Sequence, residues 1–305
     1  MGGHRRGWGC GARGGSPLPR LGTQNPGARR ALRLPAVVLR LPIVLSSRLK
    51  KVISQEANRA LSIVAEEAAP RWPQYAAYCR GRESGMRSVA FQHLSAFVSA
   101  ICGDSFAKRR DFVDWLCDRF WHYERAAAGL LPEPLLQRVL LPTLEEWRSA
   151  TPVQSSPWRW SGVVLSATGY QGMRAGLYAP NSDAQEFLTR AIEIDPGDQI
   201  ALLRLVECRI GFLDFQAHHL PDGYLGDPEA DLQLAADATS LCQRIQNNAA
   251  RDRLLQELAG ARELILDWGE SQRSGKDFRT WCREHNRNYE QTITRVYVRK
   301  PETSA

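Results

Sequence analysis

A Gly- and Pro-containing stretch that begins at residue 214 carries the densest group of side chains able to do chemistry. Two imidazoles, three carboxylates and one phenol lie within the 14 residues 214–227. Neutral imidazole and carboxylate are suitable ligands for zinc or iron, and functional groups often lie on loops. The stretch is therefore a candidate metal, catalytic or partner-binding site made of Asp214, His218, His219, Asp222, Tyr224 and Asp227.

The same residues also suit a structural role. Adjacent histidines usually point to different sides of the backbone, so one metal ion would need a further ligand from elsewhere. His218 can cap the end of a preceding helix, while Asp222 before Gly223 and Asp227 before Pro228 can cap turns. Metal binding, partner binding and capping all stay open at this point.

Other catalytic signals are weak. The sequence has no GxxxxGK[ST], HExxH or GxSxG motif, and no GxGxxG between a strand and a helix. Glu145 and Glu146 could form the acid pair of a glycoside hydrolase, but helix neighbours project about 100° apart. A solvated helix face accounts for them better. We therefore predict no catalytic residue, no metal ligand and no cofactor.

The cysteines indicate a reducing compartment. Their number is odd, no pair has CxxC spacing, and several lie among apolar neighbours at helical spacing, which favours buried thiols over a disulfide framework. We therefore expect a cytoplasmic protein, with a mitochondrial location as the alternative if the N-terminus is a transit peptide. The seven are Cys10, Cys79, Cys102, Cys117, Cys208, Cys242 and Cys282.

The formal net charge of +7 is unevenly distributed. Residues 1–55 contain nine arginines and two lysines but no acid. Without these 11 bases the chain has 29 bases against 33 acids, so the remaining 250 residues carry a charge of −4. The basic balance therefore belongs to the N-terminal segment, and the rest of the chain is mildly acidic.

Residues 1–46 are predicted to be a disordered basic tail, because a composition dominated by Gly, Arg and Pro buries too little apolar area to offset chain entropy. A transit peptide, a nucleic-acid-binding arm and an extension without function all stay open. The apolar run at 34–46 is too short and too interrupted to cross a bilayer. We expect it to lie as a strap on the helical body, and we expect no membrane segment.

From residue 47 onward, apolar side chains recur every three to four positions between Pro and Gly breaks. This pattern predicts an all-α fold, either an irregular helical-hairpin bundle or a short solenoid. We divide it into an N-terminal helical region at 47–150, a C-terminal helical region at 182–292 and a tail at 293–305. Helices are expected at 47–69, 75–79, 89–101, 105–128, 134–150, 183–194, 198–212, 229–247, 251–271 and 277–291.

Residues 151–181 break the periodic pattern with seven prolines and glycines. We interpret this segment as an irregular joint with at most a short strand at 163–166. Trp158 and Trp160 are expected to pack on the body, because each ring can bury about 200 Å². The stretch at 292–298 also has the composition of a strand.

The segment 184–196 resembles the second helix of a tetratricopeptide repeat, with small, large and proline residues at the spacing of that family: Ala184, Leu188, Ala191 and Pro196. Small residues allow close helix approach, and the proline fixes the exit. Gly172 falls at the small position of the preceding helix, and a fainter echo occurs around Gly85 and Ala90. The resemblance implies a helical-hairpin scaffold with a concave surface for peptides or partner proteins, and no catalytic chemistry.

The leading hypothesis is therefore a noncatalytic α-helical scaffold that binds a protein or peptide partner. A first alternative is an enzyme or metal protein with its site at 214–228. A second is association with nucleic acid through the basic tail alone.

Overall fold

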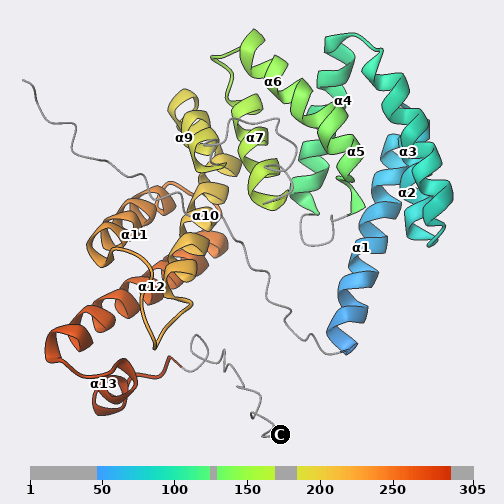
Figure 1. The fold of residues 1–305 in the computed structure, drawn as a ribbon. Coiled ribbons are helices and arrows are strands. Elements are labelled where there is room, and N and C mark those ends of the chain that lie inside the picture. Colours follow the sequence, from blue (N-terminus) through green and yellow to red (C-terminus); the bar gives the residue numbers. More distant parts are fainter. Residues whose placement is uncertain (1–46, 124–128, 169–183, 290–305) are drawn as a thin grey trace, which may run out of the picture. The chain divides into compact units, whose positions relative to one another are not determined.

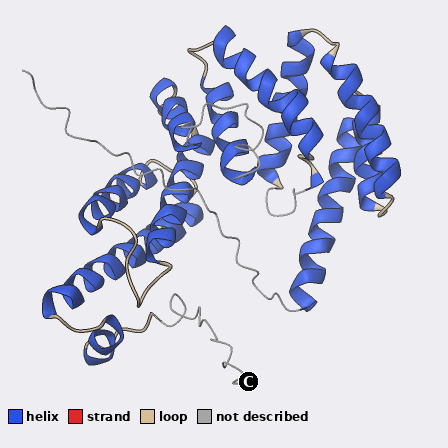
Figure 2. Cartoon of the chain, in the orientation of Figure 1, coloured by secondary structure: helices blue, strands red, loops and turns tan. Residues whose placement is uncertain are grey.

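The computed structural model describes residues 47–123, 129–168 and 184–289, with side chains described from residue 55 onward. Every regular element in these ranges is a helix, and none is a strand (Figures 1 and 2). The prediction of an all-α fold is therefore confirmed for the described part of the chain. None of the described helices has the length and apolar character needed to cross a bilayer.

Five predictions fall outside the described residues. They are the disordered tail at 1–46, the strap at 34–46, the strand-like stretch at 292–298, the tail at 293–305 and the small helix position at Gly172.

The N-terminal helices follow the predicted order and bury an aromatic cluster. They are α1 (Ser47–Ala68), α2 (Pro73–Glu83), α3 (Arg87–Cys102) and α4 (Phe106–His122). The ring centroid of Tyr75 on α2 lies 5.5 Å from that of Phe97 on α3 and 5.4 Å from that of Phe112 on α4. The Tyr75 hydroxyl donates to the Leu130 carbonyl oxygen at 2.9 Å, so the one polar atom of this buried side chain is satisfied.

The helical stretch predicted at 134–150 contains a change of helix type. It consists of α5 (Glu133–Leu135), a π-helical turn η2 (Leu136–Leu140) and α6 (Leu141–Ala150). Pro142 lies in the first turn of α6. A proline ring clashes with the carbonyl four residues earlier in an α-helix, and the wider π turn accommodates it. The helix therefore changes type just before Pro142 and continues as an α-helix from Leu141.

A helix, α7 (Ser155–Thr168), occupies much of the segment predicted to be irregular, so the predicted strand at 163–166 is wrong. Adjacent Val163 and Val164 suit a strand because they are β-branched. Both are nevertheless fully buried on a helix that packs against α9 (Ala184–Ile194). Tertiary packing overrides the local preference here.

The two tryptophans of α7 pack inward, as expected. Trp160 is 2% exposed, and its Nε1 donates to Asp114 Oδ1 on α4 at 2.6 Å. Trp158 is partly buried against the main core, with its ring centroid 6.1 Å from that of Phe187 on α9. The indoles of α7 therefore contact helices on both sides of it in the sequence.

The C-terminal helices agree with the predicted order. After α9 come α10 (Gln199–Ala217), α11 (Pro228–Cys242), α12 (Asn248–Ser274) and α13 (Phe278–Glu284). Gly275 has a left-handed φ of 70° and ends α12. The last helix is shorter than the predicted 277–291, because Asn286 also adopts a left-handed conformation, with φ 52°.

From α4 onward the helices contact one another in a regular order. Each of α7, α9, α10, α11 and α12 packs against the next described helix, and alternate helices of this described series also touch: α4 with α7, α7 with α10, and α10 with α12. We call α4, α7, α10 and α12 the alternate-helix row. This order of contacts is that of successive helical hairpins laid side by side (Figure 1).

A missing side chain permits the closest of these contacts. A Cβ atom placed on Gly162 of α7 would lie 2.5 Å from Leu188 Cγ and 3.0 Å from the Ala184 carbonyl oxygen on α9. Both distances are shorter than a packed core allows. Glycine is therefore required for α7 and α9 to approach this closely.

Substitution of Gly162 tests this contact. We expect Gly162→Ala to lower the free energy of unfolding by about 1–3 kcal/mol, because Leu188 and the α9 backbone must move apart. The matched control is Gly260→Ala in the middle of α12, where a Cβ would meet no atom within 4 Å. Alanine there should stabilise the helix by about 0.5–1 kcal/mol. Urea unfolding followed by circular dichroism measures both, and equal behaviour of the two variants would contradict the account.

Candidate functional site

The end of α10 places His218 in a capping position. His218 is the C-cap residue of α10, and its backbone amide donates to the Phe215 carbonyl oxygen at 3.4 Å. Its imidazole Nδ1 is hydrogen-bonded to the same carbonyl, and the imidazole stacks on the Phe215 ring with the centroids 4.7 Å apart. These contacts complete the hydrogen bonding at the end of the helix.

The two histidines lie together, contrary to the expectation that they point to different sides. The ring centroids of His218 and His219 are 4.1 Å apart. His218 keeps helical dihedral angles, φ −68° and ψ −12°, so the opposed directions of an extended chain do not apply. No group of three or more His, Cys, Asp or Glu side chains suited to hold a metal ion occurs among the described residues.

Tyr224 and Asp231 fix the loop to the start of α11. The Tyr224 hydroxyl donates to Asp231 Oδ2 at 2.8 Å, and Asp231 is only 5% exposed. A Cβ on Gly226 would collide with the same carboxylate, so the loop can pass over Asp231 only with glycine there. The Tyr224 ring packs against both the main core and a small apolar cluster shared by α12 and α13. Tyr224 therefore anchors the loop.

The remaining carboxylates of the group divide into bound and solvent-facing residues, and Asp214 lies on α10 instead of in the predicted loop, because α10 extends to Ala217. Asp227 caps α11, with its Oδ1 accepting from the Glu229 amide at 3.0 Å. Asp214 and Asp222 reach the surface, as does His219. Partial burial, and next the Glu257 carboxylate of α12, raise the pKa of Asp214 above its usual value. The predicted group of six is thus one neighbourhood in which three residues hold the fold and three face solvent.

Buried cysteines offer no reactive thiol in the described structure. Cys79 and Cys117 are both inaccessible, and burial raises the pKa of Cys79 to about 12. Burial raises the pKa of Cys117 as well. Thiols with raised pKa values are poor nucleophiles at neutral pH because little thiolate forms. All six cysteines in the described ranges are free, which agrees with the predicted absence of a disulfide framework.

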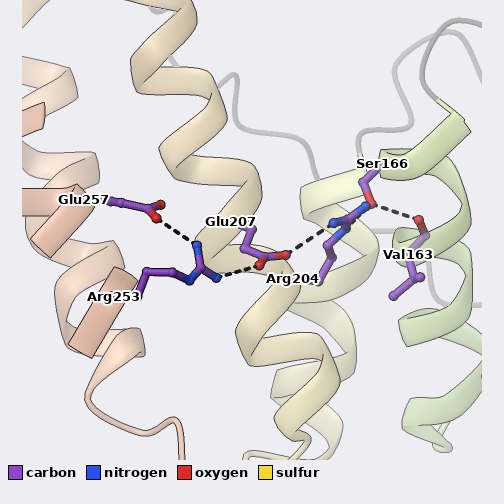
Figure 3. Close-up of polar contacts among 6 residues, drawn as sticks. All are labelled: Val163, Ser166, Arg204, Glu207, Arg253 and Glu257. Carbon is purple, nitrogen blue, oxygen red and sulfur yellow. Dashed lines mark hydrogen bonds and ion pairs between the residues drawn. The ribbon is translucent and has the colours of Figure 1, made fainter. Parts of the chain in front are cut away.

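A chain of polar contacts joins three helices of the alternate-helix row, and no sequence motif indicated it (Figure 3). Arg204 on α10 donates from Nε to Ser166 Oγ on α7 at 2.7 Å and from Nη1 to Glu207 Oε2 at 3.3 Å. Glu207 also accepts from Arg253 Nη2 on α12 at 3.2 Å, and Arg253 Nη1 donates to Glu257 Oε1 at 2.8 Å. We call these five residues the polar ladder.

Burial decreases along the polar ladder from α7 to α12. The side chain of Arg204 is 11% exposed and that of Glu207 is 29% exposed, whereas Arg253 is 46% exposed. Ion pairs that are more exposed contribute less, because water and salt screen them. The Arg204 end of the ladder therefore matters more for stability than the Glu257 end.

A hollow lies elsewhere, along α12. It encloses about 380 Å³ and is bordered by two arginines, three carboxylates and two apolar residues, none of them from 214–228. Two of the carboxylates pair with one of the arginines: Arg287 contacts Glu263, and its Nε lies 3.0 Å from Asp267 Oδ2. The hollow is open and its charges are largely paired, which does not favour a catalytic cleft.

Comparison of this chain with protein-family models, with curated proteins and with solved structures gives no match. The functional argument therefore depends on the geometry of the chain itself.

The raised pKa of Asp231 predicts a pH effect. Burial, the largest cause, raises this pKa above the ordinary 3.8, so the folded state holds the proton more tightly than the unfolded state. Ionisation of Asp231 thus disfavours folding as pH rises through and above 3.8.

We expect the stability of Asp231→Asn relative to the natural chain to increase as pH rises over this range. Urea midpoints at several pH values measure it. Asp222→Asn, on the exposed part of the loop, is the matched control, and a pH-independent difference for Asp231→Asn would refute the assignment.

The polar ladder predicts that substitutions at its two ends lower stability by different amounts. Glu207→Gln should lower the free energy of unfolding by about 1–2 kcal/mol, because the Arg204 side chain, which is 11% exposed, would no longer pair with this carboxylate. Glu257→Gln, at the exposed end, should change it by less than about 0.5 kcal/mol. Thermal unfolding at low and high salt measures both. A larger loss for Glu257→Gln than for Glu207→Gln would contradict the graded ladder.

Proposed function

We propose that this chain is a noncatalytic α-helical scaffold that binds a protein or peptide partner, with hairpins built in the manner of tetratricopeptide repeats. The observation that carries the proposal is the alternate-helix row. The helices α7, α10 and α12 touch in succession, as the helices of stacked hairpins do. Surfaces built from stacked repeats are used to bind extended partners.

The close contact between α7 and α9 supports the repeat-like character. The resemblance of 184–196 to a repeat's second helix requires a small residue on the preceding helix, opposite Leu188. Gly162 fulfils this role on α7, since its missing Cβ leaves room for Leu188 and for the Ala184 backbone. Gly172, to which the sequence assigned that role, lies outside the described residues.

The rigidity of the row supports binding without large rearrangement. Asp198 caps α10 by accepting from the Ala201 amide at 3.0 Å, and its other oxygen lies 3.0 Å from Arg159 Nη1 on α7. The Asp198 side chain is 1% exposed, so this pair is shielded from water and salt. A preorganised surface loses little entropy when a partner binds.

Selection from a library of displayed random peptides tests the proposal with the full chain as bait. We expect peptides that share a motif, saturate in fluorescence anisotropy and compete with one another, because one surface binds them. Scrambled versions of the same peptides are the matched controls. Failure to enrich any peptide, or enrichment of peptides whose binding does not saturate, would contradict a peptide-binding scaffold.

A further inference from the structure

Three large apolar side chains are exposed where α10 ends. Phe212 and Phe215 are each 39% exposed, and Leu225 in the following loop is 48% exposed. The Leu225 amide donates to the Gln216 carbonyl oxygen at 2.9 Å, which holds Leu225 beside the last turn of α10. Phe212 and Phe215 are three residues apart and therefore share one side of the helix. We call these three side chains and their immediate surroundings the α10 end face.

The stretch of sequence that contains the α10 end face is rich in acids. Residues 210–243 contain six acids and neither lysine nor arginine. No ion pair within the described ranges involves any of the six, and five of them belong to residues exposed at the surface, Asp231 being the buried one. The face therefore combines exposed aromatic area with a local excess of negative charge.

This combination selects one class of partner. Exposed apolar area is stabilised by contact with apolar side chains, at roughly 25 cal/mol per Å² removed from water. Unpaired carboxylates attract lysine and arginine, and an arginine can also lie over an exposed phenylalanine ring. The same negative charge repels the phosphates of nucleic acids and of anionic lipid surfaces.

We propose that the α10 end face is the docking surface for a polypeptide segment in which lysine or arginine alternates with apolar residues. This inference rests on the proposed scaffold function and names the surface and partner chemistry for it. Phe212 and Phe215 receive the apolar side chains of the partner. Asp222 on the loop binds its cations, and Asp214, which projects from a different side of α10 than the two phenylalanines, attracts them at longer range.

The peptides selected with the full chain test the inference. We expect them to be enriched in lysine and arginine next to leucine, isoleucine or aromatic residues. The double variant Phe212→Ser/Phe215→Ser should weaken their binding at least about tenfold, as loss of an aromatic anchor does. Asp214→Asn/Asp222→Asn should weaken it about threefold and reduce its dependence on salt.

The control is Met86→Ser/Val153→Ser, which removes two other exposed apolar side chains, 55% and 78% exposed, and should change binding less than about twofold. Circular dichroism and thermal unfolding verify that each variant is folded. Peptides without bases, or binding that the phenylalanine variant leaves unchanged, would overturn the α10 end face while the scaffold function stands. If no peptide is enriched at all, the scaffold function and this inference both fail.

Discussion

The packing of α7 on α9 at Gly162 is the constraint on which the C-terminal hairpins depend. A Cβ at this glycine would overlap Leu188 and press on the Ala184 carbonyl, so the distance between the two helices is set by the absence of a side chain. Leu188 is fully buried in the same contact. Since α10 packs on both α7 and α9, a change in their separation would also displace α10.

Polar contacts then fix the position of α10 relative to its neighbours. At its beginning, Asp198 caps the helix and pairs with Arg159 of α7. In its middle, Arg204 and Glu207 link it to α7 and α12 (Figure 3). Its end is held by Tyr224 and the loop that leads into α11. The exposed phenylalanines thus lie on a helix that polar contacts hold at its beginning, middle and end. This suits a preformed binding surface.

Helical periodicity predicted most of the described helices, because their apolar faces are local features of the sequence. The helix α7 escaped prediction, since prolines, glycines and the adjacent valines at 163 and 164 are locally typical of loops and strands. The candidate residues at 214–227 fall into structural and solvent-facing groups. The sequence could not predict which of these residues are structural. The Tyr224 hydroxyl binds Asp231 on the next helix, and the same carboxylate leaves no room for a side chain at Gly226. The polar ladder joins residues from three helices, and no local spacing reveals such a contact.

The central claim is that Gly162 and Leu188 act as one packing unit, and a double-mutant cycle tests it most directly. Leu188→Ala removes the side chain that a Cβ at position 162 would strike. In that background, Gly162→Ala should therefore lower the free energy of unfolding by less. The account predicts that the double variant is more stable, by about 1 kcal/mol, than the sum of the single losses implies. Strict additivity of the two losses in urea unfolding would show that the two positions act independently, and would contradict the account.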